Sequence, residues 1–211
     1  MNNKIIVIGG GGHAKVLISI LIKLKKYNII GYTDNENKGP ILGVKYIGTD
    51  KVLNDYCKNL KVKNAVLGLG QIKSSQHRKI TSRKIKSKGY NFPCIISPDA
   101  IINENVDIGQ GTVIMDGVVL NSGTKLGKFC IINTNSSIDH DCIIGNHTHI
   151  APGVTISGKV NIGNNVLIGT GANIIQQKNI VDDVTIGAGA TIIRDIDIAG
   201  IYIGVPAKRL E

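Results

Sequence analysis

One histidine in the second half of the chain has acidic neighbours on both sides. His140 lies between Asp139 and Asp141, within the stretch NTNSSIDHDCIIGNHTHIAPGVTISG. A carboxylate on one ring nitrogen fixes the tautomer of an imidazole and raises the basicity of the other nitrogen, which suits a general base. A solvated polar corner is the alternative. His147 and His149 complete the cluster, but the spacing does not match a zinc site, and we expect no metal.

Four glycines form a second candidate site near the start of the chain. The stretch IVIGGGGHAKVL, residues 6–17, places them between an apolar run and an expected helix, where free backbone N–H groups and the helix dipole attract an anion. Gly9, Gly11 and Ala14 satisfy the dinucleotide fingerprint, and Asp34 stands where a ribose-binding acid is expected. The motif alone would favour NAD. The domain holds only about half the strands of a full dinucleotide fold, which favours a single nucleotide.

The elements that position this turn alternate between strands and helices. The pattern predicts strands at residues 4–8, 28–33 and 65–69 and a basic helix at residues 78–88. A first helix is expected to bury one apolar face, made of Val16, Leu17, Ile20, Leu21 and Leu24. This alternation predicts a small parallel sheet covered by helices, a half-Rossmann-like α/β domain at residues 1–93.

A six-residue repeat runs through the second half. Every sixth residue from Ile96 to Ile198 is aliphatic, and a second register four residues later, from Ala100 to Ala190, is small or β-branched except at Lys178. Such a fixed period is typical of a β-helix. Glycine follows the aliphatic residue at positions 18 residues apart, Gly109, Gly127, Gly145 and Gly163. We therefore expect three short strands per coil in a triangular prism of nearly six coils, with glycine at one corner because of its dihedral freedom.

The composition of the chain limits which class of protein and which partners are expected. With 42% hydrophobic and 19% charged residues the chain is globular, and it shows no signal peptide pattern and no apolar run long enough for a membrane span, so we expect a cytoplasmic protein. Cys94, Cys130 and Cys142 occupy the small inward register, where packing is their expected role. The net charge of +10 suits anionic partners, or reflects coding bias alone. With 4% aromatic residues and no nucleic-acid motif, we expect no nucleic acid partner.

The [LIV]-G-x-x-[STAV]-x pattern resembles the hexapeptide acyltransferase superfamily, whose fold is a left-handed parallel β-helix. The order of glycine-rich domain, prism and a GVPAKRL tail is similar to bacterial nucleotide-sugar acetyltransferases of the bacillosamine N-acetyltransferase and sialic acid O-acetyltransferase group. The resemblance implies a substrate domain at residues 1–93, an acyltransferase domain at residues 94–200 and a tail at residues 201–211. It implies a homotrimer in which acetyl-CoA lies in the cleft between neighbouring subunits.

The resemblance also assigns roles to residues. His140 would remove a proton from the sugar amine, Asp141 would orient it, and His149 would contact acetyl-CoA. Apart from the resemblance, the tetrahedral oxyanion needs a hydrogen-bond donor, and we expect a backbone N–H near Gly158, one coil along from His140, to supply it. Further acetyl-CoA contacts are implied at Thr170, Ala188, Pro206 and Lys208, and nucleotide-sugar contacts at Gly11, Gly12, His13, Asp34, Asn35 and Gly70.

The implied reaction is acetylation of a UDP-linked 4-amino-4,6-dideoxy sugar for a surface glycan or glycoprotein. Several alternatives stay open: a dTDP- or GDP-linked amino sugar, O-acetylation of a sialic acid, a non-catalytic trimeric scaffold that binds sugar nucleotides, and an NAD-binding regulator. The chain departs from its relatives at Gln176, Gln177 and Lys178, where they often have Pro-Asn and an apolar residue. A bulge at that corner would alter the contacts there.

Overall fold

The structure is a computed structural model that describes residues 3–72 and 75–210. The chain divides into two compact units. The first consists of residues 1–71 and 76–98, and the second of residues 72–75 and 99–211. No helix in the described part of the chain is long and apolar enough to cross a membrane.

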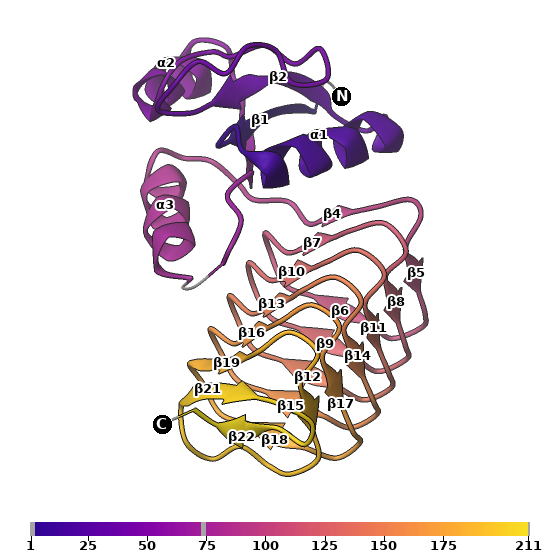
Figure 1. Ribbon diagram of the computed structural model, residues 1–211. Coiled ribbons are helices and arrows are strands. Elements are labelled where there is room, and N and C mark those ends of the chain that lie inside the picture. The colour runs from indigo at the N-terminus through magenta and orange to yellow at the C-terminus, as the bar shows by residue number, and fades with distance from the viewer. Residues whose placement is uncertain (1–2, 73–74, 211) are drawn as a thin grey trace. The chain divides into compact units, whose positions relative to one another are not determined.

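The first unit is a three-stranded parallel sheet with helices (Figure 1). Its elements are β1 (Lys4–Ile8), α1 (Gly12–Leu24), β2 (Asn28–Thr33), the short 3₁₀ helix η1 (Asp50–Val52), α2 (Leu53–Lys58), β3 (Asn64–Leu67), α3 (Gln76–Ser87) and β4 (Ile95–Ile96). The strand order is β2-β1-β3, with residues 5–8 of the central strand almost fully buried. The predicted strands and two helices are confirmed, but the buried face of α1 differs from the predicted one. Val16, predicted on that face, is 40% exposed, whereas Ile18 is buried together with Leu17, Ile20 and Leu21. The short α2 was not predicted, because it buries only Leu53 and Cys57.

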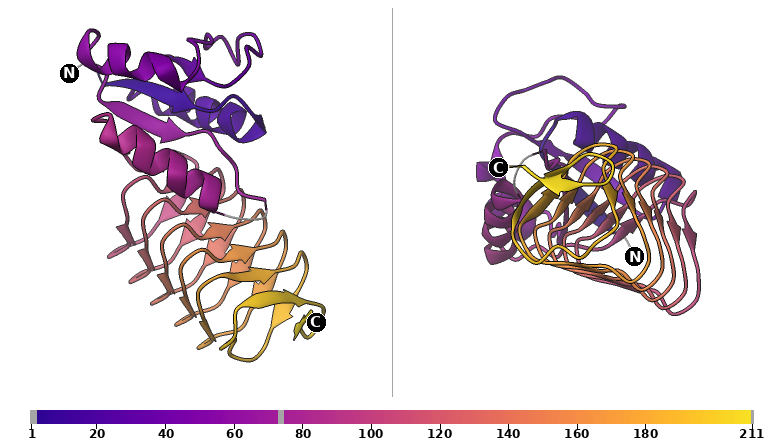
Figure 2. Two further views of the ribbon diagram at one scale, coloured as in Figure 1. Left: turned by 90° about the vertical axis from the view of Figure 1, so that its left-hand side faces the viewer. Right: turned by 60° about the horizontal axis from the view of Figure 1, so that its bottom comes forward.

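The second unit is a parallel β-solenoid in which each coil contributes one short strand to each of three sheets (Figure 2). The first sheet contains β7 (Val113–Ile114), β10 (Ile131–Ile132), β13 (His149–Ile150), β16 (Leu167–Ile168), β19 (Val184–Ile186), β21 (Gly200–Ile203) and β22 (Lys208–Arg209). The second contains β5 (Ile101–Ile102), β8 (Val119–Leu120), β11 (Ser137–Ile138), β14 (Thr155–Ile156), β17 (Asn173–Ile174) and β20 (Thr191–Ile192). The third contains β6 (Asp107–Ile108), β9 (Lys125–Leu126), β12 (Ile143–Ile144), β15 (Asn161–Ile162) and β18 (Asn179–Ile180).

Paired residues in neighbouring coils are 18 positions apart, as Ser137 and Thr155 show, so the predicted three-sided coil is confirmed. From Ile114 to Ile192 every aliphatic ladder side chain is at most 5% exposed. The polar members of the second register are also buried. The hydroxyls of Thr112, Thr124 and Thr148 donate to carbonyls of the next coil, whereas that of Ser136 donates to the carbonyl of Asn133 in its own coil. Oγ1 of Thr148, for example, donates to the carbonyl of Gly163 at 2.9 Å. Burying these inward hydroxyls therefore costs little free energy of folding, because each has a hydrogen-bond acceptor.

The repeating glycines are needed for a different reason from the one predicted. Gly109, Gly127, Gly145 and Gly163 do not adopt a positive φ. Instead the backbones of neighbouring coils meet there, and a Cβ on Gly145 would lie 2.4 Å from the carbonyl carbon of Gly163. Close approach of the coils, not dihedral freedom, excludes a side chain at this corner.

The ladder ends one step earlier than the six-residue pattern predicts. Ile198 is 59% exposed, whereas Ile196 is 4% exposed and bridges to Ile180, 16 residues before it. The last coil is thus two residues shorter than the others. The corner at Gln176 to Lys178 keeps the regular spacing, since Asn179 pairs with Asn161, so no extra residue bulges there.

Candidate active site

His140 lies at a corner of the solenoid, on the turn between β11 and β12. Its side chain is 53% exposed, and its Nδ1 lies 2.9 Å from Oδ2 of Asp141. The carboxylate holds the ring proton on Nδ1, because an ionised carboxylate only accepts hydrogen bonds. Nε2 is then left with a free lone pair, the atom that a general base needs. The structure brings these two predicted catalytic residues together.

Asp139, the other acidic neighbour, holds the backbone instead of the ring. Its Oδ1 accepts hydrogen bonds from the backbone N–H of His140 and from Nδ2 of Asn121, both at 2.9 Å. Asn121 in turn accepts from Nδ2 of Asn103 at 2.7 Å. The three side chains are 18 residues apart and form a ladder along the corner. This ladder fixes the turn from which the imidazole projects.

A depression of about 420 Å³ opens beside His140. It is lined by Asp139, His140, Ser157, Gly158, Lys159, Gln176 and Gln177. Gly158 and Gln176 follow His140 at intervals of 18 residues, so they occupy the same corner in the next two coils. Sequence reasoning placed Gly158 near His140 but missed Ser157 and Lys159, which become visible only when the corner is followed from coil to coil.

Gly158 packs directly against the imidazole. A Cβ at this position would lie 2.5 Å from Nε2 of His140, so only glycine lets the ring occupy its place. The carbonyl of Gly158 accepts from the N–H of Gln177 at 3.0 Å, but the N–H of Gly158 donates no hydrogen bond within residues 3–72 and 75–210. That N–H is therefore available to a ligand beside the base.

The predicted acetyl-CoA residues lie elsewhere on the solenoid. Thr170 and Ala188 stack in adjacent coils at the corner between the first and second sheets, and both are exposed. His149 lies on β13, where Nε2 is 3.3 Å from Nδ2 of Asn133, a residue that the sequence reasoning did not single out. Within one chain the second sheet separates the corner of Thr170 from the corner of His140.

The tail residues reach the last coil. Pro206 and Lys208 are exposed, and β22 pairs antiparallel with β21. The backbone N–H of Ala207 donates to the carbonyl of Thr191 at 2.8 Å. The tail is thereby held on the end of the solenoid in the first sheet, to which β13 and His149 also belong.

The four consecutive glycines at residues 9–12 divide into two pairs. Gly9 has a φ of +102° and a Cβ there would meet Leu69 at 2.7 Å, while a Cβ on Gly10 would meet the ring of Tyr32 at 2.5 Å. These two glycines are required by packing. Gly11 and Gly12, in contrast, have open space around them and begin α1.

The start of α1 suits an anion. Gly11 is the N-cap residue and supplies no side-chain cap, and the first turn contains no acidic residue. The N-terminal N–H groups and the positive end of the helix dipole are therefore uncompensated by the helix's own side chains. Gly70 lies beside this turn, since a Cβ on it would be 3.6 Å from Cβ of His13. Gly11, Gly12, His13 and Gly70 thus lie close together, and their contact with a nucleotide sugar stays a prediction.

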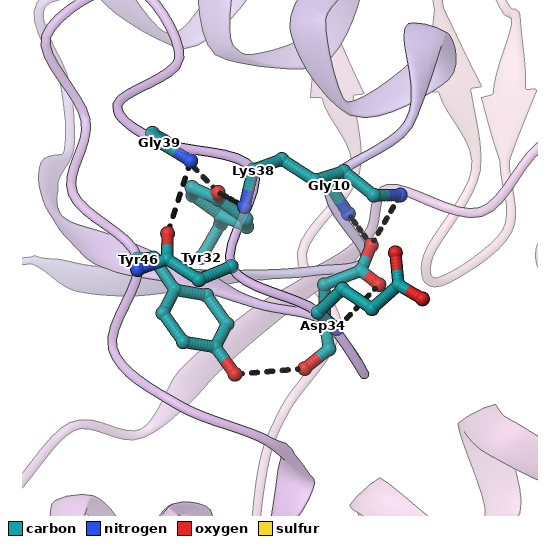
Figure 3. Close-up of polar contacts among 8 residues, drawn as sticks. Gly10, Tyr32, Asp34, Lys38, Gly39 and Tyr46 are labelled. Atoms are coloured by element: carbon teal, nitrogen blue, oxygen red, sulfur yellow. Dashed lines mark hydrogen bonds and ion pairs between the residues drawn. The ribbon is translucent and has the colours of Figure 1, made fainter.

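Asp34 is held at the carboxyl end of β2 by the glycine turn (Figure 3). Its Oδ2 accepts from the N–H of Gly10 at 2.7 Å and pairs with Nζ of Lys38 at 3.2 Å. Tyr46 donates its hydroxyl proton to the carbonyl of Asp34 at 3.2 Å. The sequence predicted an acid here, but not that one of its oxygens would tie the turn to β2.

A cavity of about 80 Å³ lies at the carboxyl ends of the parallel strands, where open α/β sheets bind ligands. Asp34 and Asn35 line it, as do residues that the sequence reasoning did not assign to a site. The full lining is Ile8, Gly9, Thr33, Asp34, Asn35, Asp50, Leu69, His77 and Thr81. Gly11, Gly12, His13 and Gly70 do not line it, and the cavity meets the glycine turn at Gly9.

Burial acts to raise the pKa of Asp34, but hydrogen bonds from the N–H of Gly10 and from Lys38 outweigh it, and the pKa lies below its ordinary value of 3.8. A lowered pKa means that the ionised carboxylate stabilises the fold above that value, and that this stabilisation is lost as the pH falls through the lowered pKa. We expect Asp34→Ala to reduce the free energy of unfolding by about 2 kcal/mol at neutral pH, because a charged hydrogen bond is lost and Gly10 loses its acceptor.

Urea unfolding of both proteins at several pH values measures this effect. The difference between wild type and Asp34→Ala should shrink below pH 3.8, where the carboxylate becomes protonated. A difference that grows on acidification would contradict the assignment. Asn35→Ala, at an adjacent residue for which no such bond is seen, serves as the control.

No group of three or more His, Cys, Asp or Glu side chains that could hold a metal ion occurs within the described ranges 3–72 and 75–210. His147, a member of the sequence cluster, instead stacks on Phe129, with ring centroids 5.3 Å apart and planes 4° from parallel.

The three-sided coil and its six-residue ladder define the class of hexapeptide-repeat transferases. Residues 123–158 match the family of bacterial transferase hexapeptide repeats, and residues 4–84 match the PglD N-terminal domain family. No curated protein matches the chain.

Solved structures resemble both parts of the chain together. The acetyltransferase domain of PglB from Neisseria gonorrhoeae FA1090, solved in complex with acetyl coenzyme A, is 34% identical with a TM-score of 0.91, covering 100% of each chain. PerB from Caulobacter crescentus, in complex with CoA and GDP-perosamine, is 31% identical with a TM-score of 0.91, covering 99% of this chain and 97% of PerB. The chain belongs to this family of hexapeptide-repeat acetyltransferases with a PglD-type N-terminal domain.

Proposed function

We propose that the protein transfers the acetyl group of acetyl-CoA to the amine of a nucleotide-linked amino-deoxy sugar, with His140 as the general base. The observation that carries this proposal is the imidazole with Nδ1 on Asp141 and Nε2 against Gly158, beside an open depression. Two similar proteins support the substrates, since PglB was solved with acetyl coenzyme A and PerB with CoA and GDP-perosamine.

The proposed reaction uses the corner as follows. The amine nitrogen attacks the carbonyl carbon of the thioester, and Nε2 of His140 takes the proton that the nitrogen loses. The N–H of Gly158 donates to the oxyanion of the tetrahedral intermediate. The C–S bond then breaks, and the imidazolium returns its proton to the departing CoA sulfur. Asp141 stabilises the imidazolium during these steps.

The first unit is proposed to hold the nucleotide. The uncapped start of α1 with Gly11, Gly12 and His13 would take the diphosphate, because N–H groups and the helix dipole favour a negative charge. Asp34 and Asn35 would contact the nucleoside in the cavity at the strand ends. A UDP-linked 4-amino-4,6-dideoxy sugar is the first candidate, and the likeness to PerB makes a GDP-linked sugar the second.

We further propose that the active enzyme is a homotrimer. Thr170 and Ala188 lie at a different corner of the coil from His140, so one chain cannot present both groups to a single acetyl-CoA lying along one edge. A second copy placing its Thr170 corner beside the His140 corner completes the site. Light scattering at the enzyme concentration used for assays should give the mass of three chains, and a monomer with full activity would contradict this arrangement.

The acceptor is tested by the release of free CoA thiol with matched sugars. UDP-, GDP- and dTDP-linked 4-amino-4,6-dideoxy sugars should be compared with the same nucleotides carrying a 4-hydroxyl. We expect one amine to support turnover at least about a hundredfold faster than its hydroxyl counterpart, because the amine is the stronger nucleophile and the base accepts its proton. Equal release with the hydroxyl sugar would favour O-acetylation instead.

A further inference from the structure

The charge of the chain is divided between its two units. Residues 1–98 contain 18 Lys and Arg against 4 Asp and Glu, a net charge of +14, whereas residues 99–211 contain 7 against 11, a net charge of −4. Coding bias would enrich lysine in both halves alike. The excess of positive charge is thus a property of the first unit, and it calls for an anionic partner of that unit.

Helix α3 carries the densest part of this charge. Residues 76–88 contain six Lys and Arg and no acidic residue. One face of the helix is buried and contains Arg78, Thr81, Ser82 and Ile85. The opposite face presents four cations, Lys79, Arg83, Lys84 and Lys86, none of which forms an ion pair with a described residue.

An apolar side chain stands in the middle of this basic face. Ile80 is 55% exposed. At 100° per residue it lies between Lys84 on one flank and Lys79 and Arg83 on the other. Cations thus surround an exposed aliphatic residue on one face of the helix. Such a face can contact a partner through both charged and apolar side chains.

We propose that the outer face of α3 docks on an anionic lipid bilayer. Clusters of four or more basic residues on an amphipathic helix are attracted to anionic headgroups, and an aliphatic side chain among them can enter the boundary between headgroups and acyl chains. A nucleic acid would match the positive charge equally well, but the exposed aliphatic side chain of Ile80 would not contribute to binding its phosphates. Residues 76–88 contain no Phe, Tyr or Trp on which a base could stack. This proposal does not depend on the acetyl transfer proposed above.

Vesicle flotation tests the proposal with the full chain. The probes are vesicles of phosphatidylglycerol and phosphatidylcholine in equal parts, vesicles of phosphatidylcholine alone, and a single-stranded oligonucleotide followed by fluorescence anisotropy. The test variant combines Lys79→Gln, Arg83→Gln, Lys84→Gln and Lys86→Gln. The control removes the same charge from exposed lysines elsewhere in the first unit, by Lys25→Gln, Lys45→Gln, Lys58→Gln and Lys61→Gln.

We expect the wild type to float with the anionic vesicles and not with the neutral ones. Binding should weaken steeply between about 0.1 M and about 1 M salt, as the Debye length falls from about 10 Å to about 3 Å. At about fivefold per basic residue, the α3 variant should lose at least about a hundredfold in affinity, and the control variant less than about tenfold. Circular dichroism and thermal unfolding verify that both variants are folded.

Ile80→Gln keeps every charge and provides an independent test should the fourfold α3 variant fail to fold. It should weaken vesicle binding severalfold and leave oligonucleotide binding unchanged. Three results would overturn the proposal: no flotation of the wild type, equal losses in the α3 and control variants, or tighter binding of the oligonucleotide than of the vesicles.

Discussion

Replacing His140 by alanine is expected to lower the rate of acetyl transfer by about 10²–10⁴-fold, the usual contribution of a general base. Nε2 of this imidazole is free to accept a proton while the carboxylate of Asp141 holds Nδ1. Nucleotide-sugar affinity should not change, because the proposed nucleotide contacts lie in the first unit. Thiol release measures the rate, and isothermal titration calorimetry measures the affinity.

His147→Ala is the matched control for this variant. It also removes one histidine from the cluster, but that ring stacks on Phe129 and does not line the depression. A modest loss of stability with normal turnover per folded molecule is expected. Undiminished turnover in the His140 variant would remove this residue from the mechanism.

Adding a single methyl group at Gly158 is expected to reduce turnover by about 10²-fold or more. The new Cβ would lie 2.5 Å from Nε2 of His140 and 2.7 Å from Cε1, so the ring must leave its position. A displaced base no longer reaches the amine, and a misplacement of about 1 Å can itself cost about 10²-fold. The measurement is turnover of Gly158→Ala with the acceptor identified in the sugar panel.

Gly109→Ala separates this effect from a general loss of stability. A Cβ at Gly109 would also lie 2.5 Å from its nearest neighbour, the backbone of Gly127, but in a coil without His140. Both variants should unfold at lower temperature, and only Gly158→Ala should lose turnover per folded molecule. Equal turnover losses would mean that the added methyl group lowers turnover by disturbing the solenoid and not by displacing the imidazole.

The solenoid was predictable because every coil needs the same types of residue at the same positions. An aliphatic residue at each sixth position fills the same place in successive coils, so a single pattern fixes strand positions over the whole unit. The pattern failed at its end, where Ile196 takes the inward place expected for Ile198. Nothing in a periodic pattern signals a coil that is two residues shorter.

The site was predictable only in part. The pairing of His140 with a neighbouring carboxylate follows from adjacent residues, and the family resemblance singled out Asp141, whose Oδ2 lies 2.9 Å from Nδ1 of the ring. Asp139 is instead engaged by Asn121, 18 residues away, a contact that exists only once the coils are stacked. In the first unit, the bond from Gly10 to Asp34 likewise joins residues 24 positions apart, and spacing alone does not show which atoms meet.

Mass spectrometry of the sugar product tests the central claim most directly. After incubation with acetyl-CoA and the panel of nucleotide-linked amino sugars, one sugar should gain the mass of a single acetyl group, with fragmentation placing it on the amine nitrogen. The same incubation with the His140→Ala protein should give little of this product. Absence of acetylated product from every amino sugar of the panel, with the wild-type protein folded and acetyl-CoA intact, would contradict the account.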